Sequence, residues 1–160
     1  MTIQVGDHLP QVTFRVSGPE GPQAKTTDDL FKGRRVVLIG VPGAFTPACH
    51  RNHLPGYVAN RDAILARGID AIAVTSVNDV FVLNAWQQQS GAEGIEFLAD
   101  GNAEFVKATG LEMDGTGFGL GIRSQRYAML VDDGVVRVLN VEDTPSKAEI
   151  SGADALLKVI

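Results

Sequence analysis

The fold of this chain is decided by residues 35–49, which read RVVLIGVPGAFTPAC. The first seven of these residues form a mostly apolar, β-branched run of strand length, typical of a strand that is covered on both faces of a sheet. Pro42 and Gly43 end the run, and a helical stretch follows from about Pro47 to Arg67. A buried strand that passes through a short turn into a helix predicts an α/β fold.

The rest of the chain continues this alternation. We predict strands at 69–76, 95–98, 127–131 and 135–141, helices at 78–89 and 102–109, and a last helix that begins at Ser151. Asn78 and Ser151 are the expected N-caps. Asp132-Asp133-Gly134 predicts a tight hairpin turn, and Thr13 to Val16 suggests a further hairpin near the N-terminus. The order predicts one domain over residues 1–160, with a mixed central sheet flanked by helices.

Composition excludes several classes of protein. Of the 160 residues, 44% are hydrophobic and 21% are charged, and the formal net charge is -5. An acidic chain favours neither nucleic acid nor an anionic membrane as a partner. No apolar run approaches the roughly 18 residues of a membrane span. The first residues show no basic region followed by an apolar stretch, so we expect no signal peptide and a cytoplasmic location.

The chain has one cysteine, Cys49, and therefore no internal disulfide. Cys49 is expected in the first turn of the helix that Pro47 opens, because a proline there loses no hydrogen bond. Free backbone N–H groups and the positive end of the helix dipole stabilise a thiolate at such a position. The Thr46 hydroxyl is close enough in sequence to bond the sulfur. From these residues alone, Cys49 is either a nucleophile or a small buried hydrophobic residue.

Several segments carry a resemblance to a known family. Residues 42–49, together with His53 to Tyr57, resemble the active-site signature of the peroxiredoxins. Further matches, in the family's order, are 76–79, 97–100, 123–127 and 139–142. The chain is most similar to the atypical fifth type, called type II in plants. The resemblance implies a thioredoxin-like fold with peroxiredoxin-type additions, a homodimer, and a thiol-dependent peroxidase for hydrogen peroxide and alkyl hydroperoxides.

The resemblance also implies roles for single residues. Cys49 matches the peroxidatic cysteine, which attacks the peroxide and becomes a sulfenic acid. Thr46 matches the threonine that orients the peroxide, and Pro42 matches the proline that shields the sulfur from water. Arg126 matches the arginine that favours the thiolate and polarises the peroxide. No metal, haem or flavin is implied.

The chain departs from the family pattern at three places. Ala48 and His50 stand where small polar or β-branched residues are commoner, and Ser151 falls near the resolving cysteine of some animal members. Because no second cysteine exists, the sulfenic acid must be met by an outside thiol such as glutathione, glutaredoxin or thioredoxin.

Two other polar residues, His53 and Arg123, allow two interpretations each. His53 could support the thiolate or contact the peroxide, or it could be a hydrogen-bonded structural histidine. Arg123 could assist Arg126 or pair with a carboxylate. His8 and His50 are expected at the surface. Cys49, His50 and His53 offer too few ligands for a zinc site.

Two further features are interpreted as structural. Residues 115–121 lack the spacing of a nucleotide-binding loop and are expected to form a flexible loop before Arg126. Trp86 is expected in the core, on a helix whose apolar face includes Val82 and Ala85.

Two other functions remain compatible with the sequence. One is a Cys–His hydrolase or transferase with His53 as base. The other is a redox-sensing or chaperone-like binding protein whose cysteine oxidises without turnover.

Overall fold

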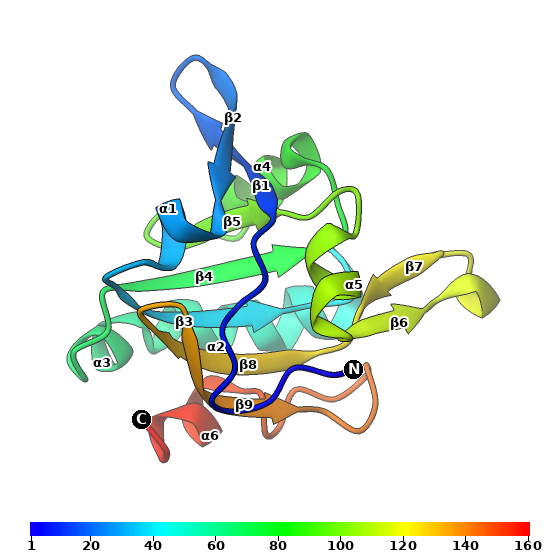
Figure 1. Cartoon of the computed structure of the whole chain (residues 1–160). Coiled ribbons are helices and arrows are strands. Elements are labelled where there is room, and N and C mark those ends of the chain that lie inside the picture. Colours follow the sequence, from blue (N-terminus) through cyan, green and yellow to red (C-terminus); the bar gives the residue numbers. More distant parts are fainter.

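The computed structural model describes residues 1–160 and is built around a seven-stranded mixed sheet with the order β2-β1-β5-β4-β3-β8-β9 (Figure 1). The strands are β1 (Thr13–Gly18), β2 (Gly21–Thr26), β3 (Arg35–Gly40), β4 (Ala71–Ser76), β5 (Glu96–Ala99), β6 (Glu112–Asp114), β7 (Ile122–Ser124), β8 (Tyr127–Asp132) and β9 (Val135–Val141). β6 and β7 form a separate two-stranded ribbon.

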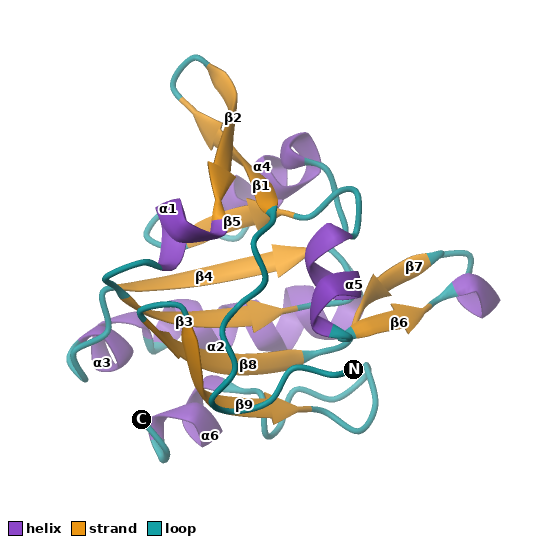
Figure 2. Ribbon diagram, in the orientation of Figure 1, coloured by secondary structure: helices purple, strands orange, loops and turns teal.

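Helices cover both faces of the large sheet (Figure 2). They are α1 (Thr27–Phe31), α2 (Leu54–Ala59), α3 (Arg61–Leu65), α4 (Val80–Gln89), α5 (Glu104–Thr109) and α6 (Ala153–Leu157), with a π-helical turn η1 (Cys49–His53) and a 3-10 turn η2 (Thr116–Phe118). None of these helices has the length and apolar character needed to cross a membrane. The predicted fold class, a mixed central sheet flanked by helices, is confirmed.

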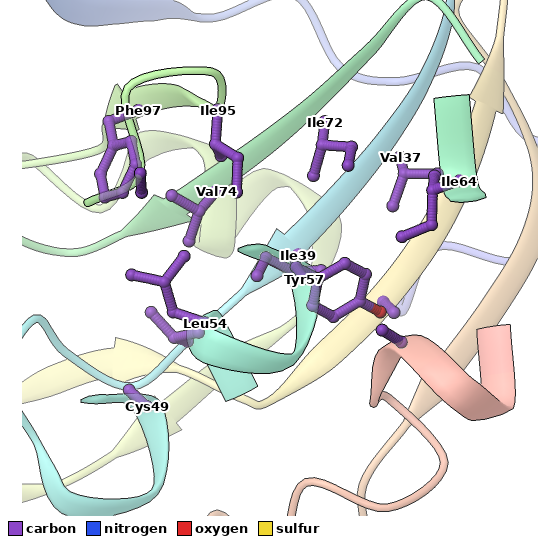
Figure 3. Packing of buried hydrophobic residues seen from close by; sticks show 14 of the residues in the cluster. Val37, Ile39, Cys49, Leu54, Tyr57, Ile64, Ile72, Val74, Ile95 and Phe97 are labelled. Carbon is purple, nitrogen blue, oxygen red and sulfur yellow. The ribbon is translucent and has the colours of Figure 1, made fainter. Parts of the chain in front are cut away.

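The central strands are apolar because both of their faces are buried. β3 runs parallel to β4 and antiparallel to β8, so it lies inside the sheet. Its side chains alternate between two hydrophobic clusters: Val37 and Ile39 face η1, α2, α3, α4 and α6, whereas Val36 and Leu38 face α1 and α5. Figure 3 shows residues of the first cluster, which includes Cys49 on its helical turn. Burial of both faces explains the continuous apolar run that the sequence shows at 35–41.

Several predicted elements are present. The turn between β8 and β9 has positive φ at Asp133 and Gly134, 50° and 79°, as a two-residue hairpin turn requires. The N-terminal hairpin exists as β1 and β2. Gly110, at φ 73°, ends α5, and Trp86 is fully buried.

Other local predictions were wrong. Asp79, not Asn78, caps α4 by accepting from the backbone N–H of Val82. Gly152, not Ser151, is the N-cap residue of α6, because the Ser151 hydroxyl bonds elsewhere. The buried face of α4 consists of Val80, Leu83 and Trp86, while Ala85 is exposed. The loop predicted at 115–121 is present and carries η2, but the two short strands that flank it, β6 and β7, were not predicted.

The helix after β3 begins with an unexpected turn. Leu54 N–H bonds the Cys49 carbonyl, five residues back, which makes η1 a π-helical turn. Pro55 has no N–H, and in a regular α-helix its ring would clash with the carbonyl of Arg51. A wider turn before the proline relieves that clash and displaces Cys49 and His53 relative to regular α-helical positions.

Candidate active site

The single sulfur lies where β3 gives way to a helix. Pro47 opens this helix, and the N–H of His50 bonds the Thr46 carbonyl at 2.8 Å, so Cys49 is in the first turn as predicted. The Cys49 side chain is fully buried. Burial of a thiol among apolar groups alone would disfavour its charged form, so the polar contacts of Sγ decide what this cysteine can do.

Two donors point at Cys49 Sγ. The Thr46 hydroxyl lies 2.9 Å from the sulfur, and Nη2 of Arg126 also lies 2.9 Å from it. Thr46 Oγ1 is 2.7 Å from the Gly43 carbonyl, so its one proton can be given to either acceptor. Arg126 stands 77 positions away in sequence, immediately before β8, and pairing of β8 with β3 brings it to the cysteine. A thiolate with these two donors is compensated by charge and by hydrogen bonding.

Arg126 is a buried cation without a carboxylate partner. Its exposure is 2%, and none of the salt bridges in the chain includes it. Its other two nitrogens donate to neutral acceptors, Nε to the Pro145 carbonyl at 3.0 Å and Nη1 to His53 Nδ1 at 3.0 Å. A buried guanidinium is costly unless an anion neutralises it. Cys49, as thiolate, is the group in hydrogen-bond contact that can supply this negative charge.

His53 lies behind Arg126 and is neutral. Burial, together with the charge of Arg126, lowers the pKa of His53 from 6.5 to about 3. Nε2 lies 3.0 Å from the Ser151 carbonyl and therefore carries the proton, which leaves Nδ1 to accept from Arg126. With both nitrogens engaged, the direct contact with the thiolate or the peroxide that the sequence allowed is not formed.

A cavity of about 280 Å³ opens onto the two donors. It is lined by Pro42, Thr46, Pro47, Ala48, Met113, Phe118, Leu120, Arg126, Pro145 and Ser146. Cys49 does not line this cavity, but Thr46 and Arg126 contact both the cavity and Sγ. The opposite wall, from the β6–β7 ribbon, is apolar. The site is therefore a small pocket with a polar base and one hydrophobic side.

Comparison with known proteins identifies the family. The Redoxin family model matches residues 4–157. The chloroplastic peroxiredoxin-2E-2 of Oryza sativa is 46% identical over 99% of this chain and 73% of its own length. Crystallised Prx3 of Vibrio vulnificus, reduced and in complex with H2O2, is 50% identical, with a TM-score of 0.93 over 98% of both chains. Peroxiredoxin 5 of Alvinella pompejana is 34% identical over 98% of this chain and 96% of its own, with a TM-score of 0.86.

The chain belongs to the peroxiredoxin family. It is accordingly a thiol-dependent peroxidase, an oxidoreductase that reduces hydroperoxides at the expense of thiols, and its fold is thioredoxin-like. Its relatives include proteins named as chloroplastic and mitochondrial.

The structure brings the predicted residues of this peroxiredoxin together. Cys49, Thr46 and Arg126 are in mutual contact through the sulfur, and Pro42 lines the adjoining cavity. Arg123 pairs with no carboxylate, contrary to one of its two readings, and instead donates to the carbonyls of Leu120 and Pro42.

Of the two histidines predicted to lie at the surface, only one is exposed. His8 is exposed as expected, but His50 is half-buried, because its Nδ1 accepts from the indole N–H of Trp86 at 3.1 Å. Nowhere in the peroxiredoxin do three or more histidine, cysteine or acidic side chains gather closely enough to hold a metal ion.

Sequence reasoning missed the residues behind Arg126. Tyr57 donates to the Ser151 carbonyl at 2.6 Å, and Glu142 accepts from Ser151. These contacts join residues more than 90 positions apart or use backbone atoms, so no local spacing announces them. The available signal was that both residues lie in segments that carry the family resemblance, Tyr57 in 53–57 and Glu142 in 139–142.

Proposed function

We propose that Cys49 is the peroxidatic nucleophile of this enzyme. The thiolate attacks one oxygen of the hydroperoxide, and an S–O bond forms as the O–O bond breaks. RO⁻ leaves and takes up a proton to give ROH, and Cys49 is left as a sulfenic acid. The observation that carries the proposal is the 2.9 Å contact between Sγ and the guanidinium of Arg126, a buried cation with no carboxylate to neutralise it.

Thr46, Arg126 and Pro42 prepare the peroxide for this attack. When the Thr46 hydroxyl donates its hydrogen bond to the Gly43 carbonyl, its oxygen can accept a hydrogen bond from the O–H of a peroxide that lies beside the sulfur. Arg126 stabilises first the thiolate and then the negative charge that develops on the leaving oxygen. Pro42, buried on the cavity wall, offers no N–H and keeps water from the sulfur. His53 acts through Arg126 and not on the substrate.

The substrates proposed are hydrogen peroxide and alkyl hydroperoxides. Support for the first comes from the Vibrio vulnificus relative, which was crystallised in complex with H2O2. Support for the second comes from Met113, Phe118 and Leu120, which give the cavity an apolar wall against which an alkyl group would be removed from water.

Recycling requires a thiol from another molecule. The sulfenic acid reacts with a first thiol to give a mixed disulfide and water, and a second thiol then releases Cys49 and leaves with the first as a disulfide. We propose glutathione with glutaredoxin, or thioredoxin, as the source, since the chain has no second cysteine. No metal or organic cofactor is needed for these steps. A homodimer, one functional domain over residues 1–160 and a cytoplasmic location are parts of the same proposal.

The Cys–His hydrolase is not favoured, because His53, which would act as its base, is already hydrogen-bonded to Arg126. His53 Nδ1 accepts from Arg126 and not from Cys49. A redox sensor that oxidises without turnover shares the same sulfur, and only kinetics separates it from a peroxidase.

The test is steady-state consumption of hydrogen peroxide and of tert-butyl hydroperoxide, with glutathione–glutaredoxin and with thioredoxin as reductants. We expect many turnovers with at least one reductant and none after Cys49→Ser. Peroxide consumption by folded Cys49→Ser would refute the role of Cys49. A single equivalent of peroxide consumed under every reductant would favour the sensor.

A further inference from the structure

The segment Glu142–Ser151, called the strap here, passes behind Arg126. It follows β9 and leads into α6 (Figure 1). Glu142 N–H bonds the Arg126 carbonyl at 2.9 Å, and the Pro145 carbonyl accepts from Arg126 Nε at 3.0 Å. Pro145 and Ser146 also line the cavity. The strap thus contacts both the backbone and the side chain of the catalytic Arg126.

The two ends of the strap are fastened to each other. Oε2 of Glu142 accepts from the backbone N–H of Ser151 at 2.7 Å and from the Ser151 hydroxyl at 2.5 Å. Both residues are buried, with exposures of 8% for Glu142 and 0% for Ser151. Hydrogen bonds to a carboxylate are about twice as strong as neutral ones, and a buried carboxylate deprived of them is costly. The pair closes the strap into a loop.

Closing the loop fixes an acceptor for the residues behind the arginine. The Ser151 carbonyl accepts from Tyr57 at 2.6 Å and lies 3.0 Å from Nε2 of His53. This carbonyl keeps the proton of His53 on Nε2, and Nδ1 is therefore free to accept from Arg126 Nη1. Two of the three side-chain contacts of Arg126, through Pro145 and through His53, depend on where the strap lies. The third is the contact with Cys49 Sγ.

We propose that Glu142 and Ser151 are positioning residues, which hold the strap so that Arg126 Nη2 stays on the sulfur of Cys49. This rests on the proposed role of Cys49 and Arg126. Neither residue touches the sulfur. With the Glu142–Ser151 contacts broken, the Pro145 and Ser151 carbonyls lose their fixed places, and the guanidinium samples orientations in which it no longer stabilises the thiolate or the leaving oxygen.

Four variants test the proposal: Glu142→Ala, Glu142→Gln, Ser151→Ala and, as a matched control, Asp143→Ala. Asp143 is the next residue, acidic and exposed. The measurements are kcat/KM for hydrogen peroxide, the rate of iodoacetamide alkylation of Cys49 over a pH series, and urea unfolding. The first two report on the thiolate, which a purely structural role would leave alone, and the third reports on stability.

Glu142→Ala is expected to lower kcat/KM about tenfold or more and to shift alkylation to higher pH. Glu142→Gln should recover most of the loss, because its amide oxygen can accept both bonds from Ser151. Asp143→Ala should match the wild type. If Glu142→Ala does not fold, Ser151→Ala decides, with an expected loss of about threefold, since it removes one hydrogen bond and keeps the carbonyl.

A folded Glu142→Ala with unchanged kcat/KM and an unchanged alkylation profile overturns the proposal, even if it is less stable to urea. The same wild-type behaviour in Ser151→Ala overturns it when Glu142→Ala does not fold. Cys49→Ser is assayed alongside. Residual activity there refutes the proposed function, whereas an inactive Cys49→Ser beside a fully active Glu142→Ala refutes only the positioning role.

Discussion

At the scale of single residues, the site depends on one buried cation meeting one sulfur. The guanidinium of Arg126 is 2% exposed and has no acidic partner, so its charge is directed at Cys49 and at whatever binds beside it. Such preorganised charge is effective because the surrounding protein excludes water and need not reorganise during the reaction.

Arg126→Ala is therefore expected to reduce kcat/KM for hydrogen peroxide by about 10² to 10³-fold, the usual cost of losing one donor that stabilises a developing anion. Arg51→Ala is the matched control, because Arg51 lies two residues from Cys49 but is exposed. Steady-state kinetics on both variants checks this. Equal activities for the two would show that the charge of Arg126 contributes nothing to the reaction.

His53 provides a prediction about stability and pH. The folded state lowers the pKa of His53 from 6.5 to about 3, whereas the unfolded chain binds a proton below about 6.5. The stabilisation from a neutral His53 is therefore complete above pH 6.5 and is lost progressively as the pH falls toward 3.

Urea unfolding at about pH 7, 6 and 5 tests this prediction, because these values run from about half a unit above the ordinary histidine pKa to about 1.5 units below it. His53→Asn should lose stability less steeply than the wild type as the pH falls. His8→Asn, which changes an exposed histidine, should follow the wild type. A His53→Asn slope equal to that of the wild type would contradict the buried neutral state.

Residue types and local spacing were enough to predict part of this site. Thr46 and Cys49 lie within one turn, and Pro47 marks where the helix begins, so their contact follows from local geometry. Arg126 could be placed only through the family resemblance, because its approach depends on the pairing of two strands far apart in the chain. Ser151 was misread as an N-cap, since its hydroxyl is used by Glu142. Whether a serine hydroxyl accepts from the N–H groups of a helix N-terminus or donates to a nearby carboxylate is not visible in a one-dimensional pattern.

At the scale of elements, the π-helical turn η1 sets the direction of Cys49 and His53. The sequence shows Pro55 as an interruption, but not how the helix would accommodate it. A proline can kink, end or widen a helix, and the packing of Leu54 and Tyr57 into the core decides among these. Long strands and the hairpin turn were predictable because burial on both faces and positive φ each require particular residues. The short ribbon β6–β7, with three residues a strand, carries too little pattern.

Pro55→Ala is expected to lower kcat/KM about tenfold while leaving stability to urea nearly unchanged. The new N–H can bond the Arg51 carbonyl, which allows a regular α-helical turn and moves Cys49 relative to Arg126.

Gly56→Ala is the neighbouring control for Pro55→Ala. Apart from the adjoining residues and the backbone of its own helix, no atom lies within 4 Å of a Cβ at Gly56, so the change should raise stability by about 0.5–1 kcal/mol and leave kcat/KM unaltered. If Pro55→Ala keeps full activity, the π-helical turn does not determine the orientation of the Cys49 side chain.

At the scale of the whole molecule, the site draws on three distant parts of one chain: the end of β3 with η1, the start of β8, and the strap. The pairing of β3 with β8 brings the first two parts together, and the strap contacts Arg126 through the Pro145 carbonyl. As a result the sulfur is enclosed, and the cavity beside Thr46 and Arg126 leads toward it.

This enclosure predicts the product of oxidation without a reductant. Two folded molecules cannot bring two fully buried Cys49 sulfurs within bonding distance of each other, about 2 Å for a disulfide, whereas the thiol of a reductant has to reach only one such sulfur. One equivalent of hydrogen peroxide should therefore give a chain that has gained oxygen, trapped by dimedone and seen by mass spectrometry. A non-reducing gel should show no disulfide-linked pair. A dominant linked pair would mean that η1 opens readily, and the same treatment in mild urea is the positive control.

Trp86 gives the molecule its own optical reporter. It is the one tryptophan of the chain, fully buried, and its indole N–H bonds His50, the residue that follows Cys49. The indole ring also lies 6.4 Å from that of Phe45 in the same active-site loop. Any rearrangement of this turn during oxidation or reduction changes the surroundings of a single fluorophore. The catalytic cycle can therefore be followed by stopped-flow emission of the unlabelled enzyme, with no dye attached to its only thiol.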